Sequence, residues 1–406
     1  VHTGTKTTVD IWSWIATVII CRIIISGGGR SIALFVGHIP HRLSILCHTC
    51  ILWHTPGVHR KSLTIEVEFT YISAMTLQCT VDIVWIQRND FIAIMVEQFS
   101  YNGAQLEYDW GYPSQMLIRD ILGGDEPVSN VINDYLAWIA DGTSLNVFSL
   151  YTYSYYYDLV SNANNMVEKF GSADSDQKAY AGAARAYRAL AYLDMTRMFE
   201  YKTTGFSSLD AQAEKSKVAG LTVPIVTEKT TAKESKNNPR APFYTMYRFI
   251  LNDLKLAESE MKGFERANKT QPDESVVYGL EARLWLEMAT RFEKNPEDVA
   301  NQPAHEEDAD GYAKLGVTTA DECYAKAAEY AQKAMALDGY APLSSDEWHN
   351  EKTGFNLATG AWMWSASMQD KDMLTYYWYS WLCWMGSEAP NLTWGGMGTY
   401  RCIDKS

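Results

Sequence analysis

The stretch "PFYTMYRFILNDLKLAESEM", residues 242–261, has the clearest helical pattern in this chain of 406 residues. Its apolar side chains recur three or four residues apart, so they share one face of a helix. These are Tyr247, Ile250, Leu254, Ala257 and Met261. Pro242 precedes the pattern, at a position where proline favours the start of a helix. The spacing predicts an amphipathic helix with this face in the core.

Three further stretches show the same periodicity and predict three more helices. Residues 176–199 place Ala183, Tyr187, Leu190 and Leu193 on one stripe, with Asp174 or Ser175 as the N-cap. Residues 273–292 align Val277, Leu280, Leu284 and Met288. Residues 321–340 align Tyr324, Ala327 or Ala328, Ala331 and Met335, and then end at Gly339.

The helices are expected to form pairs of a repeat. The starts at Pro242 and Asp273 lie close to the ~34-residue period of tetratricopeptide repeats, and "YAKAAEYAQKAMALDGY" (324–340) is similar to the second helix of such a unit. An acidic insertion, 293–312, lengthens the spacing to that helix. The predicted fold is mostly α: a tetratricopeptide-like helical-repeat scaffold with long, irregular, aromatic-rich loop regions.

Charge and composition change near residue 90. Residues 1–88 have a net charge of +3, whereas the whole chain has −14, and they contain six of the eight His and four of the seven Cys. We therefore predict an atypical N-terminal segment (1–90), a helical-repeat core (91–340) and an aromatic-rich C-terminal region (341–406). The acidic balance argues against a partner that is a nucleic acid.

The N-terminal segment has no interpretable motif. Arg22 follows the apolar run from Ile11 to Ile20 and keeps it too short to span a bilayer, and the run is not an intact signal sequence. The cysteines and histidines of "CHTCILWHTPGVH" (47–59) have too short a spacer for the usual zinc finger. The glycine run of "SGGGRS" (26–31) lacks the Lys-Ser/Thr that phosphate binding requires.

A family resemblance rests on the order of short motifs in residues 220–261. They are Gly220, Val223-Pro224-Ile225, Pro239-Arg240, Tyr247, Ile250, Asp253-Leu254 and Ala257. Residues 155–170 and 179–199 resemble the first helical pair of the same family, and the similarity runs from Glu97 to Ser406. In this order the motifs resemble the SusD/RagB family of outer-membrane nutrient-binding lipoproteins.

The resemblance implies a protein that binds glycans and is not an enzyme. It implies the extracellular face of the outer membrane, a lipid anchor not visible in this sequence, and a SusC-like TonB-dependent transporter as partner. The first ~90 residues do not resemble the family. Family members continue beyond "GGMGTYRCIDKS" (395–406), so residues 341–406 are expected to be a truncated ligand-binding region.

The stretch "TYYWYSWLCWMGSE", residues 375–388, is the first candidate site. Six of the ten residues from Tyr376 to Met385 are aromatic and none is charged. Trp and Tyr join a flat apolar ring to a polar group, which suits the apolar face and hydroxyl edge of a pyranose. The resemblance implies a glycan-binding aromatic arc here, and Trp378, Trp381, Trp384 and Tyr377 are the predicted stacking residues. For any one of these tryptophans, burial in the core is the alternative.

A second candidate region is formed by residues 107–127 and 135–158. Trp110 and Trp138 stand among Gly, Pro, Asp and Ser, where a large aromatic side chain is often exposed for binding. Asp120, Asp125 and Asn130 are predicted to bind sugar hydroxyls, with a solvated polar loop as the alternative. The tyrosines from Tyr151 to Tyr157 are predicted to pack in the core.

Other functions have weaker support. "EEDADGYAKLGV" (306–317) matches a calcium loop at its first six positions but has Val317 where a bidentate Glu belongs, so no cofactor is expected and calcium is the alternative. No nucleophile-elbow or HExxH motif occurs. A helical-repeat adaptor for another protein, and a glycoside hydrolase with an aromatic cleft, remain alternative functions.

Overall fold

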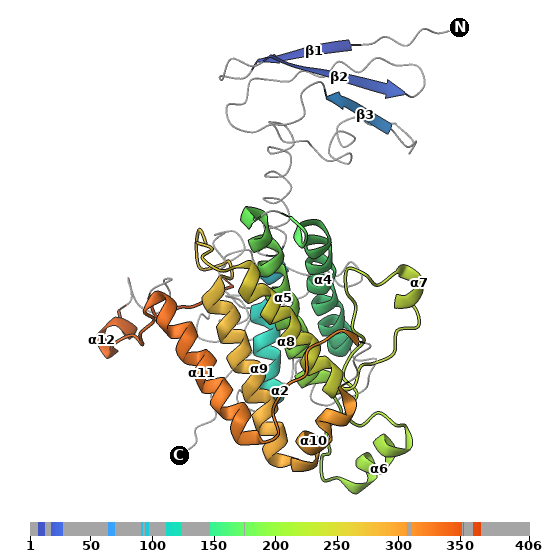
Figure 1. The fold of residues 1–406 in the computed structure, drawn as a ribbon, viewed down its shortest axis with the longest axis vertical. Helices are drawn as coiled ribbons and strands as arrows, with labels where there is room; N and C mark the ends of the chain where they lie inside the picture. The colour runs from blue at the N-terminus through green and yellow to red at the C-terminus, as the bar shows by residue number, and fades with distance from the viewer. Residues whose placement is uncertain are drawn as a thin grey trace, which may run out of the picture. The chain divides into compact units, whose positions relative to one another are not determined.

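The computed structural model describes residues 7–12, 18–26, 64–69, 91, 94–96, 111–123, 147–173, 175–306, 310–350, 352 and 360–366. The chain forms two units, Val1–Ile86 and Gln87–Ser406. In the first unit, β1 (Thr7–Trp12), β2 (Val18–Ser26) and β3 (Thr64–Phe69) form an antiparallel sheet in the order β1-β2-β3 (Figure 1). Ile11 pairs with Ile19, so the described ends of the apolar run 11–20 are strand residues.

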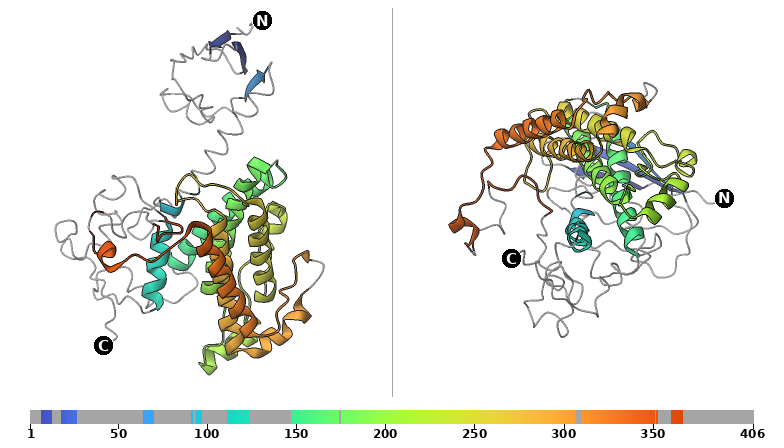
Figure 2. Two further views of the ribbon diagram at one scale, coloured as in Figure 1. Left: turned by 60° about the vertical axis from the view of Figure 1, so that its left-hand side comes forward. Right: turned by 90° about the horizontal axis from the view of Figure 1, so that it is seen from below.

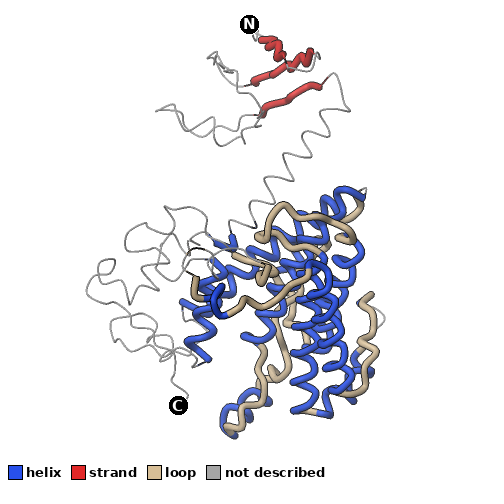
Figure 3. Tube along the Cα trace, turned by 90° about the vertical axis from the view of Figure 1, so that its left-hand side faces the viewer, coloured by secondary structure: helices blue, strands red, loops and turns tan. Residues whose placement is uncertain are grey.

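The second unit is helical in its described part (Figures 1 and 3). Its long helices are α2 (Gly111–Gly123), α4 (Val147–Phe170), α5 (Ser175–Phe199), α8 (Phe243–Glu260), α9 (Glu274–Lys294) and α11 (Ala320–Asp338). Its short helices are α6 (Ser207–Lys215), α7 (Ala232–Ser235), α10 (Pro296–Asn301), η2 (Gln302–His305) and α12 (Ser345–Trp348). The predicted mostly α fold is confirmed.

Five of the long helices stack in chain order, with α4 against α5, α5 against α8, α8 against α9 and α9 against α11. Each neighbouring pair is antiparallel. For example, Arg188 of α5 contacts Asp253 of α8, and Arg185, one turn earlier, contacts Glu260, almost two turns later. This arrangement is that of a helical repeat, in which each helix buries its apolar face against its neighbours. The helix α2 lies at the edge of this array (Figure 2).

The predicted faces of α8 and α9 are correct. All five apolar residues of the α8 stripe are fully buried, and Pro242 is the N-cap of that helix. The four residues of the α9 stripe are buried as well. The carboxylate of Asp273 caps α9 by accepting a hydrogen bond from the Val276 N–H at 3.2 Å. Both helices therefore form where local capping and periodicity agree.

The predicted single stripe of α5 is too narrow. Ala183, one of its four members, is only half-buried, whereas alanines on the other faces are buried: Ala181, Ala184, Ala186, Ala189 and Ala191. The helix packs against α4, α8 and α9, so most of its circumference lies in the core. Alanine permits this because its small side chain lets several helices approach at once.

The predicted face of α11 is wrong except at Ala327, which is buried. Met335 is 49% exposed, and the residues buried against α9 are Cys323, Ala327, Tyr330 and Ala334. Alanines occur on both faces of this helix, so the apolar periodicity fits two stripes equally well. Tyr330 decides between them, because its ring packs 5.9 Å from that of Tyr278 on α9. The predicted end is correct, since Gly339 caps α11 with a φ of +62°.

The tyrosines of α4 are core residues in part, as predicted. Tyr151, Tyr155 and Tyr156 are fully buried. Tyr153 is 37% exposed, and Tyr157 is half-buried and donates a hydrogen bond of 2.6 Å to the Pro224 carbonyl. The side chains along this helix therefore both fill the core and fix the segment that follows α6.

A buried carboxylate lies between α8, α9 and α11. The Glu281 side chain is fully buried and forms an ion pair of 2.9 Å with Lys255 of α8. Lys255 also pairs with Glu258 and donates to the Tyr330 hydroxyl of α11. Burial raises the pKa of Glu281 to about 7, although Lys255 acts in the opposite direction.

We expect this carboxylate to make stability fall as pH rises from about 4.5 to about 7. Within this range the folded state keeps a proton on Glu281 that the unfolded chain has already lost, so deprotonation costs stability. Glu281→Gln should flatten this pH dependence and raise the free energy of unfolding at pH 8 by about 2 kcal/mol. Urea denaturation from pH 4.5 to pH 8 measures both effects. An equal slope in wild type and variant would contradict the assignment.

Candidate functional site

Most predicted site residues lie outside the described residues. These are Trp378, Trp381, Trp384, Tyr377, Trp110, Trp138, Asp125 and Asn130. The cysteines and histidines of 47–59 also lie outside the described residues. Their roles stay predictions. Asp120 is described: it lies on α2 and its side chain is exposed, and its contact with sugar also stays a prediction.

The described segment 360–366, "GAWMWSA", leads toward the aromatic stretch and is fixed to the helical array. One of the side chains that fix it is Arg266, in the loop between α8 and α9. The Arg266 guanidinium donates to the Met363 carbonyl at 2.6 Å and to the Tyr340 hydroxyl at 2.5 Å, and its Nε pairs with Asp273 at 2.8 Å. We call residues 266–275, Tyr340 and 360–366 the anchor.

The same loop makes further hydrogen bonds to the segment. The Ser365 N–H donates to the Lys269 carbonyl at 2.9 Å, and the Lys269 ammonium donates to the Trp362 carbonyl. The Trp364 indole N–H donates to the Thr270 carbonyl at 3.2 Å. Because both backbone and side chains contribute, the anchor fixes the position and the direction of this segment.

One tryptophan of the C-terminal aromatic group, Trp364, packs within this anchor. The Trp364 ring stands edge-on to Tyr187 of α5, with ring centroids 5.1 Å apart. Nearby, a Cβ added to Gly279 of α9 would lie 3.1 Å from the Met363 sulfur, so glycine gives the segment room to approach that helix. Trp348 on α12 is instead 55% exposed. The tryptophans in this region therefore differ in role.

A single guanidinium joins three elements here. The Arg266 side chain is 7% exposed, and its partner Asp273 is also the N-cap of α9. The second partner of Arg266 is the hydroxyl of Tyr340, a residue that follows α11. This hydroxyl lies 3.1 Å from the Ser275 hydroxyl. Arginine suits this position because its planar group offers five donors with fixed directions. The anchor thus sets the segment against the ends of α9 and α11.

The anchor has almost no signature in the sequence. Arg266 and Lys269 belong to no sequence motif, and their partners in the segment are more than 90 positions away in the chain. Periodicity describes one helix at a time and carries no information about such pairs. The one available signal is a loop with three basic residues, Lys262, Arg266 and Lys269, ahead of the "PDES" cap of α9.

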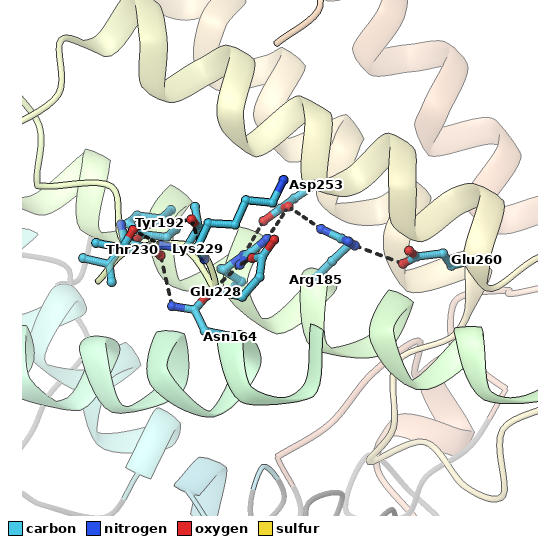
Figure 4. Close-up of polar contacts among 11 residues, drawn as sticks. Asn164, Arg185, Tyr192, Glu228, Lys229, Thr230, Asp253 and Glu260 are labelled. Carbon is cyan, nitrogen blue, oxygen red and sulfur yellow. Dashed lines mark hydrogen bonds and ion pairs between the residues drawn. The ribbon is translucent and has the colours of Figure 1, made fainter. Parts of the chain in front are cut away.

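A second group of buried charges supports the segment after α6 (Figure 4). Arg188 of α5 donates to both carboxylate oxygens of Asp253, at 2.7 and 2.8 Å, and to Glu228 at 2.8 Å. Arg185 donates to Asp253 and Glu260. Burial lowers the pKa of Arg188, but Asp253 and Glu228 outweigh it, so the net pKa is raised. This group joins α5, α8 and the Glu228 loop.

The described residues contain no group of three or more His, Cys, Asp or Glu side chains placed to hold a metal ion. In the stretch considered for calcium, Asp310 pairs with Arg248, and the Glu306 carboxylate accepts the Leu315 N–H at 2.8 Å. Both carboxylates therefore have protein partners. Each helix of the described part is too short or too polar to span a bilayer.

Comparison with known proteins gives distant likenesses in fold. No family model matches the chain, and no curated protein matches it. It is similar to the solved structure of a SusD-like carbohydrate binding protein from Bacteroides vulgatus ATCC 8482, with 18% identity and a TM-score of 0.48 over 70% of this chain and 50% of that one. The chain thus spans about half the length of that protein.

Two further solved structures are similar. A putative sugar binding protein from Bacteroides vulgatus ATCC 8482 has 19% identity and a TM-score of 0.42, over 74% of this chain and 59% of that one. A structure with xylogluco-oligosaccharide has 17% identity and a TM-score of 0.35, over 58% and 38%.

Proposed function

We propose that this protein binds oligosaccharide or polysaccharide at the cell surface without catalysing a reaction on it. The observation that supports this function is the anchor, in which Arg266 and Lys269 fix the segment that leads toward the aromatic stretch. A chain that is fixed upstream of the stretch loses less conformational entropy when the stretch binds a ligand. The tryptophans and Tyr377 then act as a prepared stacking surface.

The proposed contacts are of two kinds. Trp378, Trp381, Trp384 and Tyr377 stack on the apolar faces of sugar rings, with Trp110 and Trp138 as a second set. Asp120, Asp125 and Asn130 bind sugar hydroxyls and contribute to the choice of sugar. Stacking on an open surface buries little of the ligand, so the affinity for any one sugar unit is modest.

We further propose that the protein acts at the extracellular face of an outer membrane and delivers its glycan to a SusC-like TonB-dependent transporter. The support is the order of motifs in residues 220–261, which resembles the SusD/RagB family of lipoproteins. The structure gives two of these motif positions a physical role. Asp253 pairs with the buried Arg188, and Arg240 donates to the carbonyls of Thr222 and Leu221.

Affinity electrophoresis against neutral and acidic polysaccharides tests the binding function. One class of glycan should retard the wild type, and Trp378→Ala, Trp381→Ala or Trp384→Ala should abolish the retardation while circular dichroism stays unchanged. Trp348→Ala is a matched control, because Trp348 is exposed on α12 outside the stretch. Absence of retardation by every glycan would favour the adaptor function, and release of reducing ends with time would favour a hydrolase.

A further inference from the structure

The carboxylate of Asp194 on α5 has more basic partners than its charge requires. Its side chain is fully buried, and Arg119 of α2 pairs with its Oδ1 at 2.8 Å. The hydroxyls of Tyr112 and Tyr156 donate to its Oδ2 at 2.9 and 3.1 Å. Arg283 of α9 adds a second guanidinium at 3.3 Å, a long contact on an oxygen that Arg119 already uses.

A second carboxylate nearby shows the same excess. Glu287, one turn after Arg283 on α9, pairs with Lys202 at 2.8 Å and with Arg197 at 3.4 Å. The Glu287 side chain is only 14% exposed, whereas Arg197 and Lys202 are 49% and 44% exposed. We call Arg119, Arg197, Lys202 and Arg283 the basic strip. Four cations thus share two carboxylates, in a chain whose net charge is −14.

The basic strip lies on the same side of the α5 and α9 pair as the anchor. On α9, Arg283 and Glu287 follow Gly279 by one and two turns, so the three positions share the helix face that Met363 approaches. On α5, Asp194 follows Tyr187, the partner of Trp364, by two turns. At 1.5 Å per residue, Arg283 lies about 6 Å and Glu287 about 12 Å along α9 from Gly279, which Met363 of the anchor approaches.

We infer that the basic strip binds the acidic groups of a sugar chain, either uronate carboxylates or sulfate esters. This inference rests on the proposed glycan-binding function and specifies its ligand as acidic. The buried carboxylates already have donors, so the exposed parts of Arg197, Arg283 and Lys202 keep N–H groups for an external anion. Guanidinium groups bind carboxylate and sulfate through paired N–H donors, which adds direction to the attraction.

Neutralising the strip tests the inference. Arg197→Gln/Arg283→Gln changes two half-exposed side chains and leaves Arg119 on the buried Asp194. The matched control is Lys236→Gln/Lys314→Gln, which removes the same charge from exposed positions elsewhere. The probes are polygalacturonate, its methyl ester, and dextran sulfate. The ester has the same backbone as polygalacturonate without the charge. Dextran sulfate has sulfate esters and no uronate, so it distinguishes the two acidic groups.

Wild type should bind an acidic probe more tightly than the methyl ester, and should lose that preference in 0.5 M salt. The strip variant should bind the acidic probe roughly tenfold more weakly, while the control variant binds as wild type does. Equal binding of the acidic probe by wild type and strip variant would overturn the inference. So would retardation by neutral glycans alone, which leaves the proposed function intact.

The tryptophan variants separate the inference from the proposed function. If Trp378→Ala, Trp381→Ala and Trp384→Ala all bind the acidic probe normally and only the strip variant fails, the strip binds anions and the stacking surface is wrong. If a folded wild type binds none of these probes and none of the neutral polysaccharides, both are overturned. Thermal unfolding of each variant confirms that the differences arise from binding rather than from loss of the fold.

Discussion

Replacing Asp253 with alanine should lower the free energy of unfolding by about 4 kcal/mol. The Asp253 side chain is almost fully buried, and it accepts hydrogen bonds from Arg188 and Arg185, whose side chains are 2% and 10% exposed. Its removal leaves two guanidinium groups in the core with only part of their partners. A buried charge without its counterion is costly because protein interiors solvate it poorly.

Urea denaturation at pH 7 measures the change. Lys333→Gln is the comparison, because Lys333 and Glu329 form an exposed pair one turn apart on α11, which contributes only about 0–1 kcal/mol. A double variant, Arg188→Met/Asp253→Leu, should recover part of the loss, since apolar side chains can replace a buried ion pair. A loss below 1 kcal/mol for Asp253→Ala would show that water reaches this group in the folded protein.

The same group of charges joins α5 to residues 220–261, the part of the chain that contains the ordered motifs. Arg188 joins α5 and α8 to Glu228 in the segment after α6, and Tyr192 of α5 accepts the Val226 N–H at 2.7 Å. The Arg188–Glu228 pair requires these two residue types, whereas the Val226 contact uses a backbone N–H and requires only the tyrosine at position 192.

Local physics was predictable, and long-range pairing was not. The faces of α8 and α9 followed from spacing, because each has one apolar stripe and its start is marked by Pro242 or Asp273. The face of α11 did not, because alanines at Ala328 and Ala331 make a second apolar stripe that stays largely outside the core. Choosing between the stripes required the position of Tyr278 on a different helix.

The site shows the same division. Composition identified residues 375–388 as a candidate surface from the sequence, and its role rests on experiment. The role of Arg266 could not be predicted from the sequence, because it depends on two partners in distant parts of the chain, Tyr340 and Met363. The basic strip could not be predicted for the same reason, since its charges come from α2, α5, α9 and the residues after α5.

Arg266→Ala should release segment 360–366 from the helices while leaving the helical array folded. The change removes an ion pair of 2.8 Å with Asp273 and the hydrogen bonds to Met363 and Tyr340. Loss of such a largely buried set costs about 3 kcal/mol. The cost falls mainly on the segment, because the caps of α9 and the packing of α8 keep their other contacts. Amide exchange at Ser365 should accelerate roughly a hundredfold.

Hydrogen exchange resolved to single residues measures this release, with far-UV circular dichroism as the check on the helices. Arg266→Lys keeps the charge but loses the paired donors, so it should give an intermediate rate. Lys262→Ala is the control, because Lys262 is exposed in the same loop. Unchanged exchange at Ser365 in Arg266→Ala would show that Lys269 and Thr270 suffice to hold the segment.

Glycan affinity adds the functional consequence. If the aromatic stretch binds because it is held in place beforehand, Arg266→Ala should weaken retardation in affinity electrophoresis by about tenfold without touching any stacking residue. Trp378→Ala in the same background should then cause a smaller further loss than it does in wild type, because the two changes act on one surface. Independent, additive losses would mean that the anchor and the stacking residues serve different purposes.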